Sequence, residues 1–186
     1  MIAQKLDLKT VKDVYEKRLI LDFPKDEVKP LATIINGFNN GIYDAYGYFE
    51  AGKLLAYAFF VIDKNCRLLD YLAVSPKVRG SGVGSRFLQA LKTELKDICE
   101  LVIIESENPD AAQNEQQKSL RERRVAFYLK NGAVTTGSTA KIFGVDYKIL
   151  ALPLSENAAF TTQKYLSIYK NLLTKKLFEE NVRVLG

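Results

Sequence analysis

The sequence predicts a mixed α/β fold, because the spacing of its apolar residues changes between two periods. Strand-like segments occur at 42–49, 54–62 and 66–74. Over 82–98 the apolar residues then recur every three to four positions, which is the period of an amphipathic helix. A short apolar segment at 101–105 returns to strand character, as a buried strand would. Strands joined by a long crossover helix define the mixed α/β class.

The other elements extend this order at both ends. Thr10 followed by Asp13 predicts a capping box at the start of a first helix. The polar turn at 50–53 predicts an antiparallel hairpin between the first two strands. The remaining predicted elements are a helix over 26–36, a helix over 116–131 that ends at Gly132, a closing strand pair at 133–136 and 142–150, and a helix over 160–178.

Length and composition favour one globular domain. A single core serves ~100–200 residues, and the chain has 186. We expect a core over about 1–152 and a C-terminal helical extension over about 155–186, within one domain of 1–186. The amino terminus has no signal-peptide pattern, and no apolar run approaches the ~20 residues of a membrane span. Cys66 and Cys99 form no metal or disulfide motif, so a cytoplasmic location is the simplest reading.

The chain contains no histidine. This excludes a histidine-based catalytic triad and a histidine-ligated zinc site, and we expect no metal. A general base would have to be a carboxylate or water. The net charge of +5 admits an anionic partner, either nucleic acid or a phosphorylated cofactor. Because the basic residues are scattered and no nucleic-acid recognition motif is present, we expect no nucleic-acid partner and no membrane partner.

The segment 70–86, DYLAVSPKVRGSGVGSR, carries the clearest chemical signal. A strand ends near Val74, a glycine-rich loop follows, and a helix begins at once. This arrangement directs backbone N–H groups and the positive end of a helix dipole at one point, which suits a phosphate. The alternative is a glycine-rich turn that binds nothing. The spacing fits neither a P-loop nor the dinucleotide-binding GxGxxG pattern.

The string from Val74 to Gly84 closely resembles the pyrophosphate-binding signature V-x-P-x-x-R-G-x-G-x-G of the GNAT superfamily of N-acetyltransferases. Its core R-x-x-G-x-G is matched by Arg79, Gly82 and Gly84. About forty residues later, 124–133 (RVAFYLKNGA) resembles the fourth helix of that family. The resemblance implies a mixed, mostly antiparallel central sheet with splayed fourth and fifth strands and helices on both faces. The extra C-terminal helix lies outside this shared core.

The resemblance also implies that the chain uses acetyl-CoA (coenzyme A). The fourth strand would pair with the pantetheine arm through its last backbone amides, and the loop would hold the pyrophosphate. The residues implied for the arm are Leu72, Ala73 and Val74, and those implied for the pyrophosphate are Arg79, Gly80, Ser81, Gly82, Val83, Gly84 and Ser85.

For catalysis, Tyr128 matches the tyrosine that protonates the departing thiolate in this family. Its alternative role is a core tyrosine or one that packs on the cofactor. Glu105 closes the fifth strand, where the family often places a base, and burial would raise the pKa of its carboxyl group towards neutrality. Its alternative role is a contact to the substrate cation or to an arginine. Asp70 and Glu107 are further candidates for the base.

Two features depart from the family pattern. Arg121 and Arg124 stand where many members carry asparagine and alanine. They would contact the cofactor phosphates or an acidic group on the substrate, or they form a solvated basic face. The polar insert at 107–118 and the helix at 160–178 lie outside the shared core. These two segments would shape the amine pocket or form a homodimer contact.

The sequence therefore predicts an N-acetyltransferase that transfers the acetyl group of acetyl-CoA directly to a primary amine in a ternary complex. The substrate would be a small-molecule or peptide amine. The alternative is an acetyl-CoA-binding sensor or structural module without catalysis.

Overall fold

The computed structural model describes residues 2–25 and 27–185, and the chain divides into two compact units. The first unit comprises 1–62 and 69–94, and the second comprises 63–68 and 95–186. The single domain expected from chain length stays a prediction. Along the described residues, no helix is both long enough and apolar enough to cross a bilayer.

The strands of the first unit follow the order β1-β2-β3-β4. β1 pairs antiparallel with β2, and β2 pairs antiparallel with β3. The predicted hairpin is confirmed, since Glu50 pairs with Lys53 across a turn in which Ala51 and Gly52 have φ of 47° and 75°. The bounds are β1 Ala3–Lys5, β2 Tyr43–Glu50, β3 Lys53–Asp63 and β4 Cys66–Val74.

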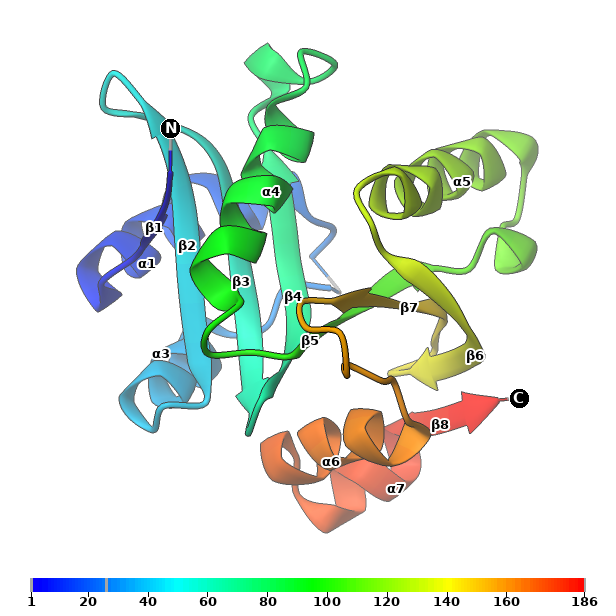
Figure 1. Cartoon of the computed structure of the whole chain (residues 1–186). Coiled ribbons are helices and arrows are strands. Elements are labelled where there is room, and N and C mark those ends of the chain that lie inside the picture. Colours follow the sequence, from blue (N-terminus) through cyan, green and yellow to red (C-terminus); the bar gives the residue numbers. More distant parts are fainter. Residues whose placement is uncertain (1, 26, 186) are drawn as a thin grey trace. The chain divides into compact units, whose positions relative to one another are not determined.

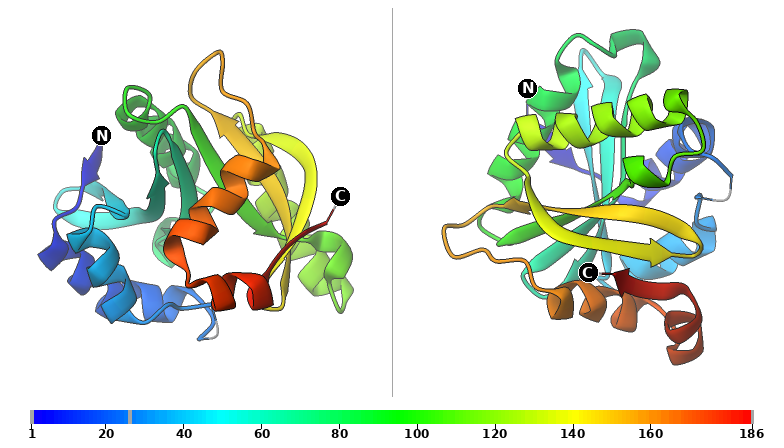
Figure 2. Two further views of the ribbon diagram at one scale, coloured as in Figure 1. Left: turned by 90° about the horizontal axis from the view of Figure 1, so that it is seen from below. Right: turned by 90° about the vertical axis from the view of Figure 1, so that its right-hand side faces the viewer.

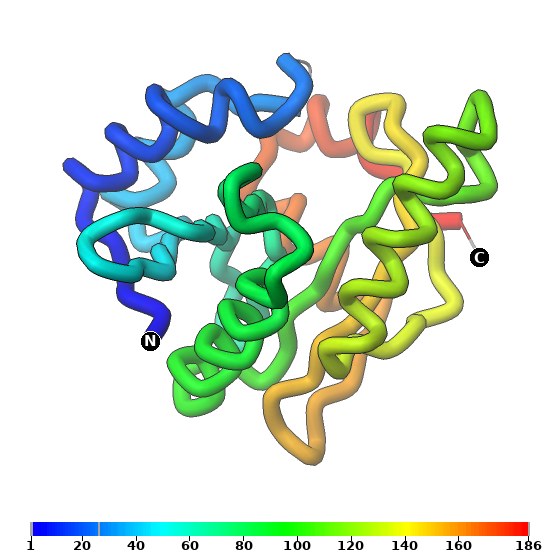
Figure 3. The backbone as a smooth tube through the Cα atoms, turned by 90° about the horizontal axis from the view of Figure 1, so that it is seen from above, coloured from blue at the N-terminus to red at the C-terminus, as the bar shows by residue number. Residues whose placement is uncertain are grey.

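The helices of the first unit cover both faces of these strands. α4 lies on one face, and α1 and α3 lie on the other (Figures 1 and 3). Large side chains such as Phe59, Phe60 and Phe87 are fully buried in this unit. The bounds are α1 Leu8–Val14, a π-helical turn Tyr15–Leu19, α2 Ile20–Asp22, α3 Leu31–Asn39, a 3-10 turn Pro76–Val78 and α4 Val83–Leu95.

Two predictions about the N-terminal helices were wrong in detail. The cap of α1 is Asp7, whose Oδ1 accepts the Thr10 N–H at 2.7 Å, so Thr10 lies inside the helix instead of capping it. Hydrogen bonds from the Thr10 side chain and then from its backbone N–H lower the pKa of the Asp7 carboxyl group. The second helix begins at Leu31, because Pro30 disfavours helical backbone at the residue before it. Asp26, its predicted start, lies outside the described residues.

The strands of the second unit follow the order β5-β7-β6-β8, in which β5 pairs antiparallel with β7, and β6 pairs antiparallel with both β7 and β8. α5 lies on one side of this sheet, and α6 and α7 lie on the other (Figure 2). The turn Phe143–Gly144 joins β6 to β7. β6 is longer than predicted, and β7 has the predicted length but begins three residues later. The bounds are β5 Leu101–Glu107, a 3-10 turn Pro109–Ala111, α5 Glu115–Lys130, β6 Val134–Ile142, β7 Val145–Pro153, α6 Thr162–Leu172, α7 Lys175–Asn181 and β8 Val182–Leu185.

The C-terminal extension is not the single helix predicted over 160–178. Leu173 adopts extended backbone and ends α6, and the side chain of Thr174 then caps α7. A further strand, β8, follows α7 and pairs with β6, which the apolar spacing did not predict. A cap of the Ser/Thr type interrupts a helix even where the hydrophobic period continues across it.

Candidate functional site

The glycine-rich loop joins the end of β4 to the start of α4. Gly80 and Gly82 have φ of 79° and 80°, a region in which side chains with a Cβ are strained. A Cβ on Gly82 would also lie 3.1 Å from Nη1 of Arg86, whereas one on Gly80 would meet open space. Backbone conformation therefore favours glycine at both positions, and at Gly82 a Cβ would also make a tight contact with the end of the Arg86 side chain.

The amides at the start of α4 suit an anion. The N–H groups of Val83, Gly84 and Ser85 lie in the first helical turn, where no intrahelical acceptor exists. The Ser81 amide differs, because it donates to the Val78 carbonyl at 3.4 Å. Three first-turn amides and the positive end of a 13-residue helix fit a diphosphate group.

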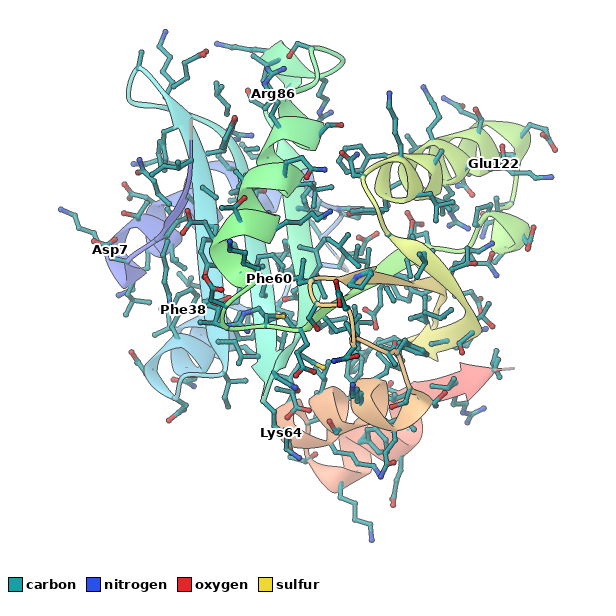
Figure 4. All side chains as sticks on the ribbon, viewed as in Figure 1. Asp7, Phe38, Phe60, Lys64, Arg86 and Glu122 are labelled. Atoms are coloured by element: carbon teal, nitrogen blue, oxygen red, sulfur yellow. The ribbon has the colours of Figure 1, made fainter. Side chains whose placement is uncertain are left out.

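Arg86 adds positive charge at the same end of α4 (Figure 4). Its Nη1 donates to the Ser81 carbonyl at 3.1 Å, so the Arg86 side chain is bonded to the backbone of the glycine loop. The Ser81 hydroxyl donates to the Val78 carbonyl at 2.7 Å. These bonds hold the loop in the shape that its glycines allow.

The last residues of β4 present their amides on alternate sides. Ser75 N–H donates to the Leu55 carbonyl of β3 at 2.7 Å. Because successive N–H groups of a strand alternate in direction, Ala73 N–H points towards β3, and those of Leu72 and Val74 point away from it. Of the three amides expected to pair with the pantetheine arm, Leu72 and Val74 are oriented for it and Ala73 is not.

Tyr128 lies in the last turn of α5 and is only 7% exposed. Its ring packs edge-on against Phe127 at 5.2 Å between centroids. Within the described part of the chain, its hydroxyl group makes no hydrogen bond. Burial raises the pKa of this phenol to about 12, and the nearby Arg124 opposes the shift. The phenol is therefore protonated at neutral pH and has no protein acceptor for its proton.

Glu105 lies in β5 and accepts two phenolic hydrogen bonds at one oxygen. Tyr169 donates to Oε1 at 2.7 Å, and Tyr165 donates to the same atom. Burial and the Glu105 charge together raise the pKa of Tyr165 well above its usual value. Two hydroxyl donors favour the ionised carboxylate. Sequence reasoning missed both tyrosines, although two buried tyrosines four residues apart signal hydroxyl groups that need partners.

The other candidate bases are also engaged. Glu107 binds Arg121 at 2.7 Å through one oxygen and Arg124 at 2.8 Å through the other. Asp70 accepts from Tyr43 at 2.6 Å and pairs with Lys29. The two arginines of α5 therefore neutralise Glu107, and neither forms the purely solvated face considered as an alternative.

The first unit thus brings together the strand end, the glycine loop and the first turn of α4. The second unit holds Tyr128 on α5 and Glu105 on β5. A strand that ends at an amide-rich helix start is the arrangement that the sequence signature of acyl-CoA-dependent acetyltransferases led us to expect.

Residues 43–132 match the family described as "Acetyltransferase (GNAT) domain". Residues 43–132 therefore carry a GNAT acetyltransferase domain, and acetyl-CoA is the acetyl donor of this family. The match runs from the start of β2 to the glycine after α5, so it contains the loop, Glu105 and Tyr128. No curated protein matches the sequence.

Solved structures share the fold at low sequence identity. An aminoglycoside 6′-N-acetyltransferase complexed with coenzyme A is 18% identical, with a TM-score of 0.66 over 86% of this chain and 100% of that one. A GNAT-family protein from Bacteroides thetaiotaomicron is 17% identical, with a TM-score of 0.68 over 96% and 99%. The ribosomal-protein-S18-alanine N-acetyltransferase of Escherichia coli is 20% identical, with a TM-score of 0.58 over 85% and 98%. At these identities the likeness concerns the fold, and the predicted mixed α/β fold of GNAT type is confirmed.

Proposed function

We propose that this acetyltransferase acetylates the amino group of a cationic amine by direct attack within a ternary complex. The observation that carries the proposal is the Tyr128 side chain in a GNAT domain, which is largely buried and whose hydroxyl makes no hydrogen bond within the described residues. When bound, acetyl-CoA would supply an activated acetyl group on a thiolate leaving group. Tyr128 would donate its proton to that thiolate, and Phe127 would fix the orientation of its ring.

The amides of Val83, Gly84 and Ser85 would hold the diphosphate, and the amides of Leu72 and Val74 would pair with the extended arm. The arm would then lie along one side of β4. The positive φ of Gly82 supports this role, because a side chain there would crowd the loop.

Direct transfer is supported by the state of both cysteines. Cys66 and Cys99 are free, and each is 3% exposed. Burial raises the pKa of the Cys66 thiol, and Cys99 Sγ donates to the Leu101 carbonyl at 3.1 Å. A thiol that is buried and protonated is a poor nucleophile. Neither side chain suits a covalent acetyl-enzyme.

Of the two roles that the sequence left open for Glu105, we propose the substrate contact. Its carboxylate is stabilised as an anion by Tyr165 and Tyr169, which suits attraction of an ammonium group and opposes proton abstraction. Since Glu107 and Asp70 are paired with cationic groups, we propose that the amine loses its proton to water. Whether the amine is a small molecule or a peptide, and the cytoplasmic location, stay predictions.

The test is a turnover screen. Purified protein is supplied with acetyl-CoA and a panel of polyamines, aminoglycosides and peptides with free amino termini, and thiol release is measured. For the best acceptor, initial rates at several concentrations of both substrates should give intersecting double-reciprocal lines. Parallel lines would indicate a covalent acetyl-enzyme and overturn direct transfer. Tight binding of acetyl-CoA without turnover on any amine would favour the non-catalytic sensor.

A further inference from the structure

The carboxylate of Asp22 occupies an energetically unfavourable place in the first unit. It is the last residue of α2, and its side chain is 6% exposed. A negative charge at the C-terminal end of a helix opposes the helix dipole, and burial removes its hydration. Something other than helix formation must stabilise an aspartate there.

Three side chains supply that stabilisation. Arg18 Nη2 lies 3.1 Å from Oδ2 of Asp22, and the Tyr57 hydroxyl donates to the same oxygen at 3.0 Å. The guanidinium group of Arg18 also lies over the Tyr57 ring, 5.7 Å from its centroid. The other oxygen, Oδ1, lies 3.7 Å from Nη2 of Arg79. Tyr57 belongs to the core of the unit, Arg18 lies one helical turn before Asp22, and Arg79 comes from the glycine loop.

Arg79 is held from two sides. Its Nε donates to the Val74 carbonyl at the end of β4 at 3.1 Å, while its Nη2 faces Asp22. The planar guanidinium fork therefore bridges the end of the strand and the end of α2. Gly80, the next residue, already turns with positive φ towards the start of α4. The direction of the Arg79 side chain thus sets where the loop leaves the strand.

The sequence signature assigned Arg79 to the pyrophosphate. We propose instead that Asp22 is a positioning residue, which holds Arg79 against the end of β4 and so sets the glycine loop in its coenzyme A-binding shape. The π-helical turn Tyr15–Leu19 directly precedes α2, and such turns often occur next to functional sites. In this arrangement the α4 amides bind the diphosphate. Arg79 does not contact the diphosphate and affects its binding only by positioning the backbone of the loop.

The two roles of Arg79 predict opposite effects at Asp22. If Arg79 contacted the diphosphate directly, Asp22→Asn would remove a nearby negative charge and would strengthen the binding of an anion or leave it unchanged. If Asp22 positions the loop, the same change weakens binding. The inference rests on the use of coenzyme A and not on the identity of the acceptor, so it is tested without any amine.

The experiment measures the dissociation constant of coenzyme A by calorimetry for the wild type, Asp22→Asn, Arg79→Gln and the double variant. We expect each single change to raise it about three- to tenfold, which corresponds to ~0.6–1.4 kcal/mol. The double variant should bind no more weakly than the single variants. Asp13→Asn, which removes an exposed pair with Lys17 on the same helix segment, is the matched control and should bind normally.

Two further arms keep the result decisive. S-acetylpantetheine has the same arm without the diphosphate, so its dissociation constant should not change in any variant. Arg79→Lys concerns a side chain that is 59% exposed, so it leaves folding intact. Lysine retains the charge but not the fork that bridges Val74 and Asp22, so this variant should behave like Arg79→Gln. Wild-type affinity in Arg79→Lys, or unchanged or tighter binding in Asp22→Asn, overturns the proposal. Failure of the wild type to bind coenzyme A overturns it together with the assignment of the cofactor.

Discussion

The hydroxyl of Tyr169 donates to Oε1 of Glu105 at 2.7 Å, and this bond ties the C-terminal helix α6 to β5. Tyr165, one turn earlier in α6, donates to the same oxygen. A segment outside the region that matches the GNAT domain therefore supplies two hydrogen-bond donors to a residue inside it. Because hydroxyl donors favour the anionic form of a carboxylate, these contacts support the proposed role of Glu105 as a contact for the substrate cation.

Glu105→Gln should raise KM for a cationic amine about 10- to 100-fold, since hydrogen bonds to charged groups contribute ~1.5–3 kcal/mol. The pH profile of kcat should keep its shape, because the amine and not Glu105 loses the titrating proton. Steady-state kinetics between pH 6 and 10 provide the measurement. Glu122→Gln, an exposed change on α5, is the control (Figure 4). If kcat of Glu105→Gln no longer rises with pH, Glu105 is the general base after all.

Tyr128→Phe should lower kcat by ~10²-fold with little change in KM for acetyl-CoA, because it removes the proposed proton donor and keeps the ring. Since burial raises the pKa of this phenol to about 12, its ionisation should produce no loss of activity below about pH 11. Tyr48→Phe is the control, because Tyr48 is a buried tyrosine that packs against Phe87 and has no part in the proposed chemistry. A rate within twofold of the wild type would leave Tyr128 as a packing residue.

Local sequence patterns predicted much of the fold. The elements that they did not predict can also be explained by features of the local sequence. β4 ends at Val74 as predicted, because the proline and glycines after it stop a strand. The α6–α7 break was missed because the apolar period runs on through Leu173, while the Thr174 cap acts on the backbone alone. Strand β8 has four residues, too few for a period to be visible.

The candidate site divides in the same way. The loop glycines were identified because phosphate binding requires backbone amides in a particular conformation. Glycine is the residue that adopts this conformation most easily. The partners of Glu105, Asp70 and Asp22 were not identified, since they lie between 4 and 64 residues away in sequence. Most of these contacts join distant parts of the chain, so the sequence pattern does not predict them. They nevertheless decide whether a carboxylate acts as a base or as a structural hydrogen-bond acceptor.

Gly82→Ala should raise the dissociation constant of coenzyme A about tenfold or more. The change places a Cβ at positive φ beside Nη1 of Arg86 and disturbs amides that would bind the diphosphate with ~1.5–3 kcal/mol per charged hydrogen bond. Calorimetry with coenzyme A gives the value.

Gly52→Ala is a close control for this change. Gly52 has φ of 75° in the β2–β3 turn and open space around it, so alanine carries the same backbone strain there. Both variants should lose ~1–2 kcal/mol of unfolding free energy, because left-handed backbone disfavours a Cβ. Only Gly82→Ala should lose affinity. Equal coenzyme A binding by the two variants would argue against the loop as the diphosphate site.

Tyr128→Phe should also change stability in a way that depends on pH. At pH 7 it should leave the free energy of unfolding unchanged or raise it by up to ~1 kcal/mol, since the hydroxyl group removed makes no hydrogen bond within the described residues. In the wild type, the folded pKa of about 12 lies above the unfolded value. The stability associated with Tyr128 is therefore fully present below about pH 10, and it falls by ~1.4 kcal/mol per pH unit between there and the folded pKa.

Urea unfolding at pH 7, 10 and 11 measures both effects, and Tyr165→Phe supplies the contrast. Tyr165 donates to Glu105, so its removal leaves a carboxylate with one donor fewer and should destabilise the fold by ~1–3 kcal/mol already at pH 7. Between pH 10 and 11, the free energy of unfolding of Tyr128→Phe should instead fall less than that of the wild type, because the phenol that ionises has been removed. If it loses stability at pH 7 as Tyr165→Phe does, its hydroxyl has a structural partner, and a phenol that is bound in the resting protein is not free to protonate a leaving group.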